Sequence, residues 1–274
     1  MTAPLLTDGM RHRIAAVPDA FHIRRLELLR DLPGNRCGVE IRRFSDTVFA
    51  TVAAALPEVG WMQHVGGLAP GDEALVPKIA AWYHGLGLRP RFEIAPAPDS
   101  EPLAAALTDA RARQTGFLDT LWARTAPPTG EAPNGVDVRV VTPRSEEAAL
   151  FARVHLGGHE VSDDGFTEHW AAIGLWPSEP EWWCYLASVA GESVGSAALA
   201  VDDGIGYFAN ASTLPSGRRR GCQQALIHRR LHDAAAAGCE LTVSLATPGT
   251  SSHRNLERAG LVVACTNVFW TVVD

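Results

Sequence analysis

The sequence lacks the patterns that mark a metalloprotein, a disulfide-stapled domain or a membrane protein. Its five cysteines are odd in number, form no CxxC pair and have no histidines at metal-ligand spacing beside them, which argues against a zinc site and a disulfide framework. No apolar run approaches the ~20 residues that a membrane-spanning helix needs, and residues 1–13 lack the apolar core of a signal peptide. We therefore expect reduced cysteines, no metal, no membrane partner and a cytoplasmic location.

An excess of basic charge is also missing. The formal net charge is -7 at pH 7, whereas binding to nucleic acid depends on a broad basic surface that neutralises phosphates. The sequence therefore argues against a nucleic-acid partner. Basic residues gather only locally, in one loop and the helix after it: Arg218, Arg219, Arg220, Arg229 and Arg230. Such a cluster suits a small phosphorylated ligand, and the alternative is a solvated helix face. Within the helix we expect Arg229 and Arg230 to face water, away from its apolar stripe.

The length and one breaker-rich segment indicate two domains. The chain has 274 residues, of which 46% are hydrophobic, enough for one large domain or two moderate ones. Residues 126–135 are dense in proline and glycine, a composition that cannot continue a helix or a central strand. We predict domains at 1–125 and 136–274, joined by a linker at 126–135.

The segment 213–226 carries the strongest chemical signal. An extended apolar stretch passes through a Gly- and Arg-rich turn directly into a helix. The first turn of a helix presents unpaired N–H groups and partial positive charge, so it binds phosphate. Two common phosphate motifs are absent, since there is no Gly-Lys-Ser/Thr and no third glycine for GxGxxG. What remains is Arg218-x-x-Gly221-x-Gln223.

The pattern of the second half predicts strand, two helices, three strands, helix, strand, helix, strand. Thr142 is the expected cap of the first helix, with Pro143 at its first position, and Gly191-Glu192 is the expected hairpin turn. The expected strands are 136–141, 182–190, 193–201, 205–213, 241–245 and 261–272. The expected helices end near 156, span 167–175, run from the Arg-rich turn to Gly238, and span about 250–260.

This order and the Arg218-to-Gln223 loop together resemble the GNAT superfamily of N-acetyltransferases. The resemblance implies an α/β (α+β) fold, with a mixed, largely antiparallel twisted sheet flanked by helices. It implies an acyltransferase that moves an acetyl group from acetyl-CoA to an amine by direct attack, without a metal. The diphosphate of the coenzyme would be held by the amides of Arg219, Arg220, Gly221, Cys222 and Gln223, and Arg218 would add charge.

A short stretch of the first half resembles part of the second half, and this similarity favours tandem GNAT-like domains. The stretch 82–94 mirrors the end of the long helix, Gly238 and the strand after it, and Trp122 mirrors Trp270. Chance similarity between two α/β segments is the alternative. Where the arginine loop should fall, the first half has Asp72 and Glu73, which would repel a diphosphate. We expect a degenerate N-terminal domain without coenzyme that shapes the acceptor cleft.

The resemblance also assigns the thioester end of the coenzyme. The fourth strand of the fold would offer its backbone to the pantetheine arm, here at Ala209, Ala211, Ser212 and Thr213, and one N–H would polarise the thioester carbonyl. In the last motif, Asn255 or Ser252 would contact pantetheine. The tyrosine that usually protonates the departing thiolate is replaced by Leu256, so the general acid stays unassigned, with Ser252 or water as alternatives.

A general base must take a proton from the acceptor ammonium. The segment 155–164 occupies the place where this family builds its acceptor pocket, so His159 and Glu160 are candidates, and Tyr207 on the fourth strand is a third. Each also fits an ordinary surface or packing role. Cys184 and Cys222 have no partner histidine in the sequence, which favours inert thiols over nucleophiles.

Two other functions stay open at this point. A non-catalytic acyl-CoA-binding or sensory module would explain the loss of the tyrosine, and a binder of another nucleotide would also use the loop. The expected partners are acyl-CoA and a small-molecule or peptide amine, and a homodimer is left open.

Overall fold

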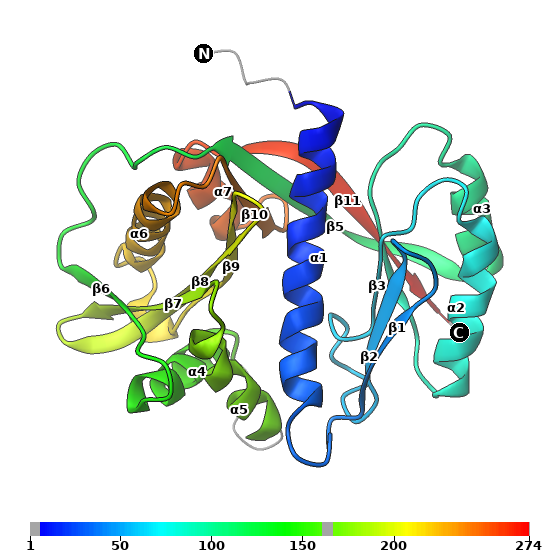
Figure 1. Ribbon diagram of the computed structural model, residues 1–274, viewed down its shortest axis with the longest axis horizontal. Helices are drawn as coiled ribbons and strands as arrows, with labels where there is room; N and C mark the ends of the chain where they lie inside the picture. The colour runs from blue at the N-terminus through cyan, green and yellow to red at the C-terminus, as the bar shows by residue number, and fades with distance from the viewer. Residues whose placement is uncertain (1–5, 161–166, 274) are drawn as a thin grey trace. The chain divides into compact units, whose positions relative to one another are not determined.

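The computed structural model describes residues 6–160 and 167–273, and the chain forms two compact units (Figure 1). Unit 1 consists of Met1–Phe21 and Thr120–Ala264, and unit 2 of His22–Asp119 and Cys265–Asp274. The segment 126–135, expected to separate two domains, therefore lies inside unit 1. None of the described helices combines the length and apolar character that crossing a bilayer requires.

Unit 1 is built on a sheet with the strand order β6-β7-β8-β9-β10-β5. The pairs from β6 to β9 are antiparallel, and β9 pairs with β10 in parallel. Two helices cover each face: α4 and α5 on one, α6 and α7 on the other (Figure 1). The strands are β6 (Val136–Val140), β7 (Trp182–Val189), β8 (Glu192–Asp202), β9 (Ile205–Thr213), β10 (Leu241–Ala246) and the end of β5 (Ala112–Arg124). The helices are α4 (Glu146–Gly158), α5 (Thr167–Leu175), α6 (Cys222–Ala236), α7 (Ser251–Arg258) and the first part of α1 (Asp8–Arg30).

The predicted elements of the second half are confirmed, with two local corrections. The cap of α4 is Ser145, whose Oγ accepts the Glu147 N–H at 3.2 Å; the predicted cap Thr142 instead donates its N–H to the Glu147 carboxylate. The β7–β8 turn is Ala190-Gly191, one residue earlier than predicted. Both turn residues have positive φ, 52° and 84°, which fits the twist of a two-residue hairpin.

Helix α6 forms because its apolar stripe packs on the sheet. Ile227, Leu231 and Ala234 are buried in the core of unit 1, at the spacing of one helix face. Gly238 lies two residues beyond the helix end with φ 75°, a left-handed conformation that glycine adopts without steric cost.

Unit 2 repeats this pattern with fewer elements. Its strand order is β1-β2-β3-β4-β11-β5, with antiparallel pairs from β1 to β3 and a parallel pair β3–β4. Helices α2 and α3 pack on one face over an apolar core that includes Tyr83 and Phe92. The elements are the end of α1, β1 (Val39–Arg43), β2 (Phe49–Ala53), β3 (His64–Gly66), α2 (Val76–Gly85), β4 (Arg91–Ile94), α3 (Glu101–Asp109), the start of β5 and the end of β11 (Val262–Val272).

Each half of the sequence gives the end of its last strand to the other unit. The final segment Cys265–Asp274 belongs to unit 2, where Val268 to Thr271 of β11 pair antiparallel with β4. The end of β5 belongs to unit 1, beside β10, where the Thr125 N–H that follows the strand donates to Glu240 O at 2.9 Å. The units therefore do not coincide with the two halves of the chain.

Candidate functional site

Strands β9 and β10 of unit 1 pair at one end only. Their parallel register runs from Ile205 and Leu241 to Phe208 and Ser244, and the Ser244 Oγ donates to Phe208 O at 2.9 Å where the register ends. Beyond that point β9 continues to Thr213 with β8 as its paired neighbour. The β10-facing edge of residues 209–213 therefore has backbone groups that β10 does not use.

A β-bulge marks the same stretch of β9. The β8–β9 register shifts between Ser196 and Ala198, and Asn210 has φ 42°. Asparagine is enriched in the left-handed region among non-glycine residues, so the sequence tolerates the bulge at this position. A bulge re-aims the backbone of a strand, here directly after the last β9–β10 pair.

The predicted phosphate loop, residues 218–223, follows β9 through a short 3-10 turn and leads into α6. Gly221 has φ 84°, a conformation that favours glycine, and a Cβ there would make a tight contact of 3.1 Å with the Pro133 side chain. The first helical bond runs from the Ala225 N–H to Gly221 O. The N–H groups of Cys222 and Gln223 therefore precede the hydrogen-bond ladder of α6, as an anion site requires.

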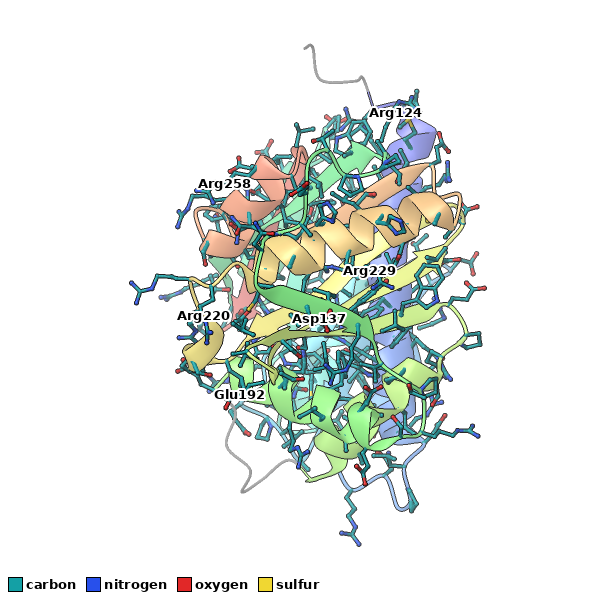
Figure 2. The ribbon with its side chains drawn as sticks, turned by 90° about the vertical axis from the view of Figure 1, so that its left-hand side faces the viewer. Arg124, Asp137, Glu192, Arg220, Arg229 and Arg258 are labelled. Carbon is teal, nitrogen blue, oxygen red and sulfur yellow. The ribbon has the colours of Figure 1, made fainter. Side chains whose placement is uncertain are left out.

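The arginines divide into two groups (Figure 2). Arg218, Arg219 and Arg220 are exposed in the loop, and the Arg218 Nη2 lies 2.8 Å from Glu160 Oε1. Figure 2 shows Arg220 at the loop and Arg229 on α6 beside β6. Arg229 pairs with Asp233 at 2.8 Å and so does not belong to the loop.

Arg230, expected to face solvent, is buried. Its Nε donates to Leu226 O at 3.1 Å and its Nη1 to Ala198 O at 3.3 Å, and the guanidinium lies 4.5 Å from the Phe208 ring centre. Burial lowers the pKa of Arg230 to about 10. The prediction was wrong because a guanidinium bonded to backbone carbonyls and stacked on a ring can be buried on an apolar helix face.

The end of α4 packs directly on the free part of β9. A Cβ at Gly158 would lie 2.6 Å from the Ser212 Oγ, so two glycines at this helix end permit the close approach. The Ser212 Oγ hydrogen bonds with the Ser196 Oγ at 3.0 Å, which contacts His155 Nδ1 at 3.4 Å. The buried Thr213 Oγ1 has no hydrogen-bond partner among the described residues. The hydrogen-bonding capacity of this hydroxyl is therefore unused within the part of the chain that the structure describes.

The structure places the three candidate bases in different surroundings. Glu160 pairs with Arg218, whereas the His159 ring meets His155 edge-on, with ring centres 5.0 Å apart, and partial desolvation lowers the pKa of His159. Tyr207 is buried and meets Phe21 edge-on at 5.5 Å. The residues 161–164 of the expected acceptor segment lie outside the described residues.

Helix α7 presents polar groups at its start and a buried leucine in its second turn. Thr250 caps the helix by accepting the His253 N–H at 3.2 Å. Ser252 is exposed and Asn255 half-buried, its Oδ1 accepting an Arg258 N–H. Leu256 lies in the core of unit 1, so the position of the expected tyrosine points away from solvent.

The cysteines have the properties of inert thiols. All five are free, and burial raises the pKa of Cys184 and of Cys222. Since the thiolate is the nucleophilic form, a raised pKa argues against covalent catalysis by either residue.

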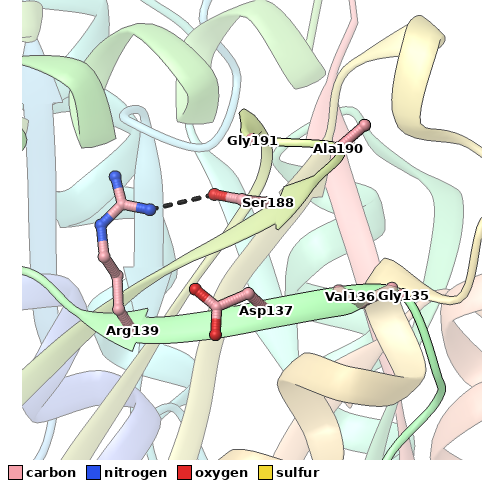
Figure 3. Close-up of a pocket in the computed structure, with 7 residues that line it drawn as sticks. All are labelled: Gly135, Val136, Asp137, Arg139, Ser188, Ala190 and Gly191. Atoms are coloured by element: carbon pink, nitrogen blue, oxygen red, sulfur yellow. Dashed lines mark hydrogen bonds between the residues drawn. The ribbon is translucent and has the colours of Figure 1, made fainter.

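A surface hollow of about 450 Å³ lies between β6 and the β7–β8 turn (Figure 3). Its charged lining residues are Asp137 and Arg139, and Arg139 is engaged by the Ser188 Oγ and by Glu147 at 2.8 Å. Val136, which also lines it, is the neighbour of Gly221. The hollow therefore adjoins the phosphate loop but contains none of the predicted site residues.

Sequence reasoning missed three features of this site. The bulge at Asn210, the Ser196 hydroxyl and the buried Arg230 all depend on the pairing of β8 with β9. An Asn in the middle of an apolar strand was the one local signal for the bulge.

Comparison with known proteins gives matches at the level of structure. No protein-family model matches the sequence, and no curated protein does. A GCN5-related N-acetyltransferase from Kribbella flavida shares 19% identity at a TM-score of 0.65, covering 96% of this chain and 95% of that one. A second such protein, from Sphaerobacter thermophilus, shares 18% at 0.60, covering 94% and 90%. A tandem GNAT protein from the clavulanic acid biosynthesis pathway shares 14% at 0.62, covering 94% and 96%.

These likenesses extend over nearly the whole chain, including both units. At such low identity they show the fold. The expected tandem GNAT-like architecture is confirmed.

Proposed function

We propose that this tandem GNAT-like chain is an N-acetyltransferase, which moves an acetyl group from acetyl-CoA to an acceptor amine by direct attack. The observation that carries the proposal is the junction of β9 and α6. After Phe208, β10 no longer pairs with the edge of β9. One loop later, helix α6 begins with Gly221 as its N-cap, and the arginines of this loop are exposed. A long ligand with a diphosphate at one end and amide groups at the other fits these two features together.

The residues of this junction fit the coenzyme chemically. The amides of Arg219, Arg220, Gly221, Cys222 and Gln223 would receive the diphosphate, and Arg218 would add charge. The backbone of Ala211, Ser212 and Thr213 would pair with the pantetheine arm as an added strand does. The unpartnered Thr213 Oγ1 supports a polar ligand beside it. Asn255, at the α7 end, would serve the same arm.

The chemistry needs few protein groups. Bound acetyl-CoA supplies a thioester that an uncharged amine attacks without an enzyme intermediate. A β9 backbone N–H near the bulge would stabilise the oxyanion as the new C–N bond forms. When the C–S bond breaks, the thiolate takes its proton from water or from Ser252. His159, whose pKa is lowered by partial desolvation and which can therefore be uncharged, would accept the ammonium proton, with Glu160 and Tyr207 as the alternatives.

We propose one coenzyme per chain, because the backbone N–H groups of the matching loop in unit 2 already donate to carboxylates of the same loop. The Gly71 N–H donates to Glu73 Oε1 at 2.8 Å and the Ala69 N–H to Asp72 Oδ2 at 3.0 Å. The hydrogen bond from the Gly71 N–H is the main cause that lowers the pKa of Glu73. The amide N–H groups of the loop before α2 that a phosphate would need are therefore already bonded to carboxylates.

The five free cysteines support a reducing, cytoplasmic setting. The acceptor would be a small-molecule or peptide amine.

The test is release of free thiol from acetyl-CoA with a panel of primary amines, followed with a thiol reagent. We expect amine-dependent release and one bound CoA per chain by calorimetry. Absence of CoA binding would contradict the proposal. Two bound CoA per chain would contradict the assignment of unit 2.

A second candidate is a non-catalytic acyl-CoA sensor. It is favoured by Leu256, which occupies the position of the usual acid and is buried in the core. In the same assay a sensor would bind CoA tightly and release no thiol with any amine.

A further inference from the structure

The sheet of unit 2 has one polar face. Strand register places Arg91 beside His64 on β3 and Thr271 on β11, and Glu93 beside Phe269. Paired residues share a face, so these side chains lie together, whereas Phe92 and Trp270 contribute to the apolar core on the opposite face. We call the set His64, Arg91, Glu93, Asn267 and Phe269 the Arg91 face.

Arg91 is the most unusual member of this face. Its guanidinium lies 3.5 Å from the Phe269 ring centre and is half-buried. Among the described residues it has no side-chain hydrogen bond, although a guanidinium has five N–H donors. Burial lowers the pKa of Arg91 and the Glu93 charge opposes this shift, and an arginine side chain keeps its proton in proteins. The ring therefore holds a charged, flat donor group in place with its N–H edge unused.

A hydrogen-bond acceptor lies beside this donor. The Glu93 side chain is 17% exposed, and its Oε1 accepts an N–H of Asn267 at 2.6 Å. Its Oε2 lies 3.9 Å from His64 Nδ1, but burial and the nearby Arg91 and Arg25 hold the pKa of His64 at about 3. His64 is thus uncharged near neutral pH and forms no ion pair with Glu93. The charge that acts on the Glu93 carboxylate is that of Arg91.

We propose that the Arg91 face binds a small carboxylate that also carries an amino or hydroxyl group. The guanidinium of Arg91 receives the carboxylate in the two-bond geometry that planar forks favour. The free Glu93 Oε2 accepts from the amino or hydroxyl group. A phosphate is disfavoured because a doubly charged anion would lie beside the Glu93 carboxylate. The site belongs to unit 2 alone and does not depend on the coenzyme site.

The probes are the twenty common amino acids with lactate and malate, each at matched ionic strength with chloride as the reference. Thermal unfolding of the full chain identifies the stabilising compounds, and calorimetry gives their dissociation constants. We expect at least one compound to stabilise the protein, with its carboxamide counterpart losing the effect. If no compound in the panel binds, the proposal is wrong.

Variants then assign the binding to this face. Arg91→Met should abolish binding, and Arg91→Lys, which keeps the charge but not the fork, should weaken it about ten-fold. Glu93→Gln should weaken binding of the amino compounds in particular. Arg42→Met is the matched control, because Arg42 also lies over an aromatic ring of unit 2, Phe44, at 5.0 Å. Retained binding in both Arg91 variants would overturn the proposal, and the lysine variant keeps the test valid if the methionine variant fails to fold.

Discussion

The Arg218 Nη2 lies 2.8 Å from the Glu160 Oε1, and this ion pair joins the residues after α4 to the loop before α6. Both side chains are largely exposed to solvent, at 49% and 67%. Glu160 therefore pairs with the guanidinium group that would bind the diphosphate of the proposed coenzyme. A carboxylate in that position acts as an internal competitor for the diphosphate.

Replacing Glu160 with Gln should tighten CoA binding. An exposed ion pair is worth up to about 1 kcal/mol, so the dissociation constant should fall by up to about five-fold, measured by calorimetry at low salt. Removal of any nearby negative charge would have a similar effect. The effect of Glu160→Gln on CoA affinity should therefore also be measured in an Arg218→Gln background. If the gain arises from this ion pair, it should vanish there. An equal gain would instead show that Glu160 acts by general charge repulsion of the coenzyme.

Reversing the charge of the loop should abolish coenzyme binding. The double variant Arg218→Glu and Arg220→Glu places two carboxylates where the diphosphate is expected, and both residues are exposed, so the fold should survive. Circular dichroism checks folding and calorimetry checks binding. Arg113→Glu, an exposed change in unit 2, is the control and should bind CoA normally. Normal binding by the double variant would refute the proposed coenzyme site.

Gly221→Ala should lose both stability and coenzyme affinity. A left-handed conformation costs a non-glycine residue about 1–2 kcal/mol, and the new Cβ would lie 3.1 Å from Pro133. Gly249→Ala is the matched control, since Gly249 also has a positive φ, 74°, but no atom within 4 Å of an added Cβ. Denaturant unfolding should show a loss of stability in both variants. A loss of CoA affinity is expected only for Gly221→Ala.

Stability should fall as the pH decreases below about 6.5, the ordinary pKa of histidine. In the folded chain the pKa of His64 is about 3 and that of His22 is also well below its ordinary value, chiefly because both are buried. The unfolded chain then binds protons that the folded chain does not, so the free energy of unfolding decreases by up to about 1.4 kcal/mol per pH unit for each histidine. Burial raises the pKa of Glu93, which opposes this trend at the acid end.

Denaturant titrations between pH 3 and pH 7 measure this slope. His64→Gln should reduce the slope of the unfolding free energy against pH by the contribution of one titrating histidine, up to about 1.4 kcal/mol per pH unit. The exposed His84→Gln serves as control and should leave the slope as it is in the natural chain. An unchanged slope in the His64 variant would show that its ring titrates freely in the folded state.

Much of the second half could be predicted because its local signals agree. The strand 205–213 and the helix 167–175 form with the predicted bounds, since apolar periodicity and flanking breakers both mark them. The phosphate loop was visible for a similar reason. Its glycine and arginines stand between a strand and a helix, and the structure gives Gly221 the conformation that only glycine adopts freely.

Features that depend on pairing between distant strands could not be predicted. Nothing in the periodicity of 262–272 says whether it pairs within its own half or with Arg91 and Phe92. Likewise, the family resemblance suggested that Glu160 lies at the acceptor pocket, but its contact with Arg218 depends on how α4 packs on β9. Arg230 was misjudged because helix periodicity does not show which carbonyl groups lie within its reach.

The exchange of final strands has a consequence for how the chain is made. The N-terminal half of a chain emerges from the ribosome first, and domains often fold in that order. Here the earlier half forms most of unit 2, yet that unit includes Cys265–Asp274, which are synthesised after all the segments of unit 1. Unit 1 has all its segments once Ala264 has emerged. The unit that receives most of the earlier half is thus completed only after every segment of unit 1 has been synthesised.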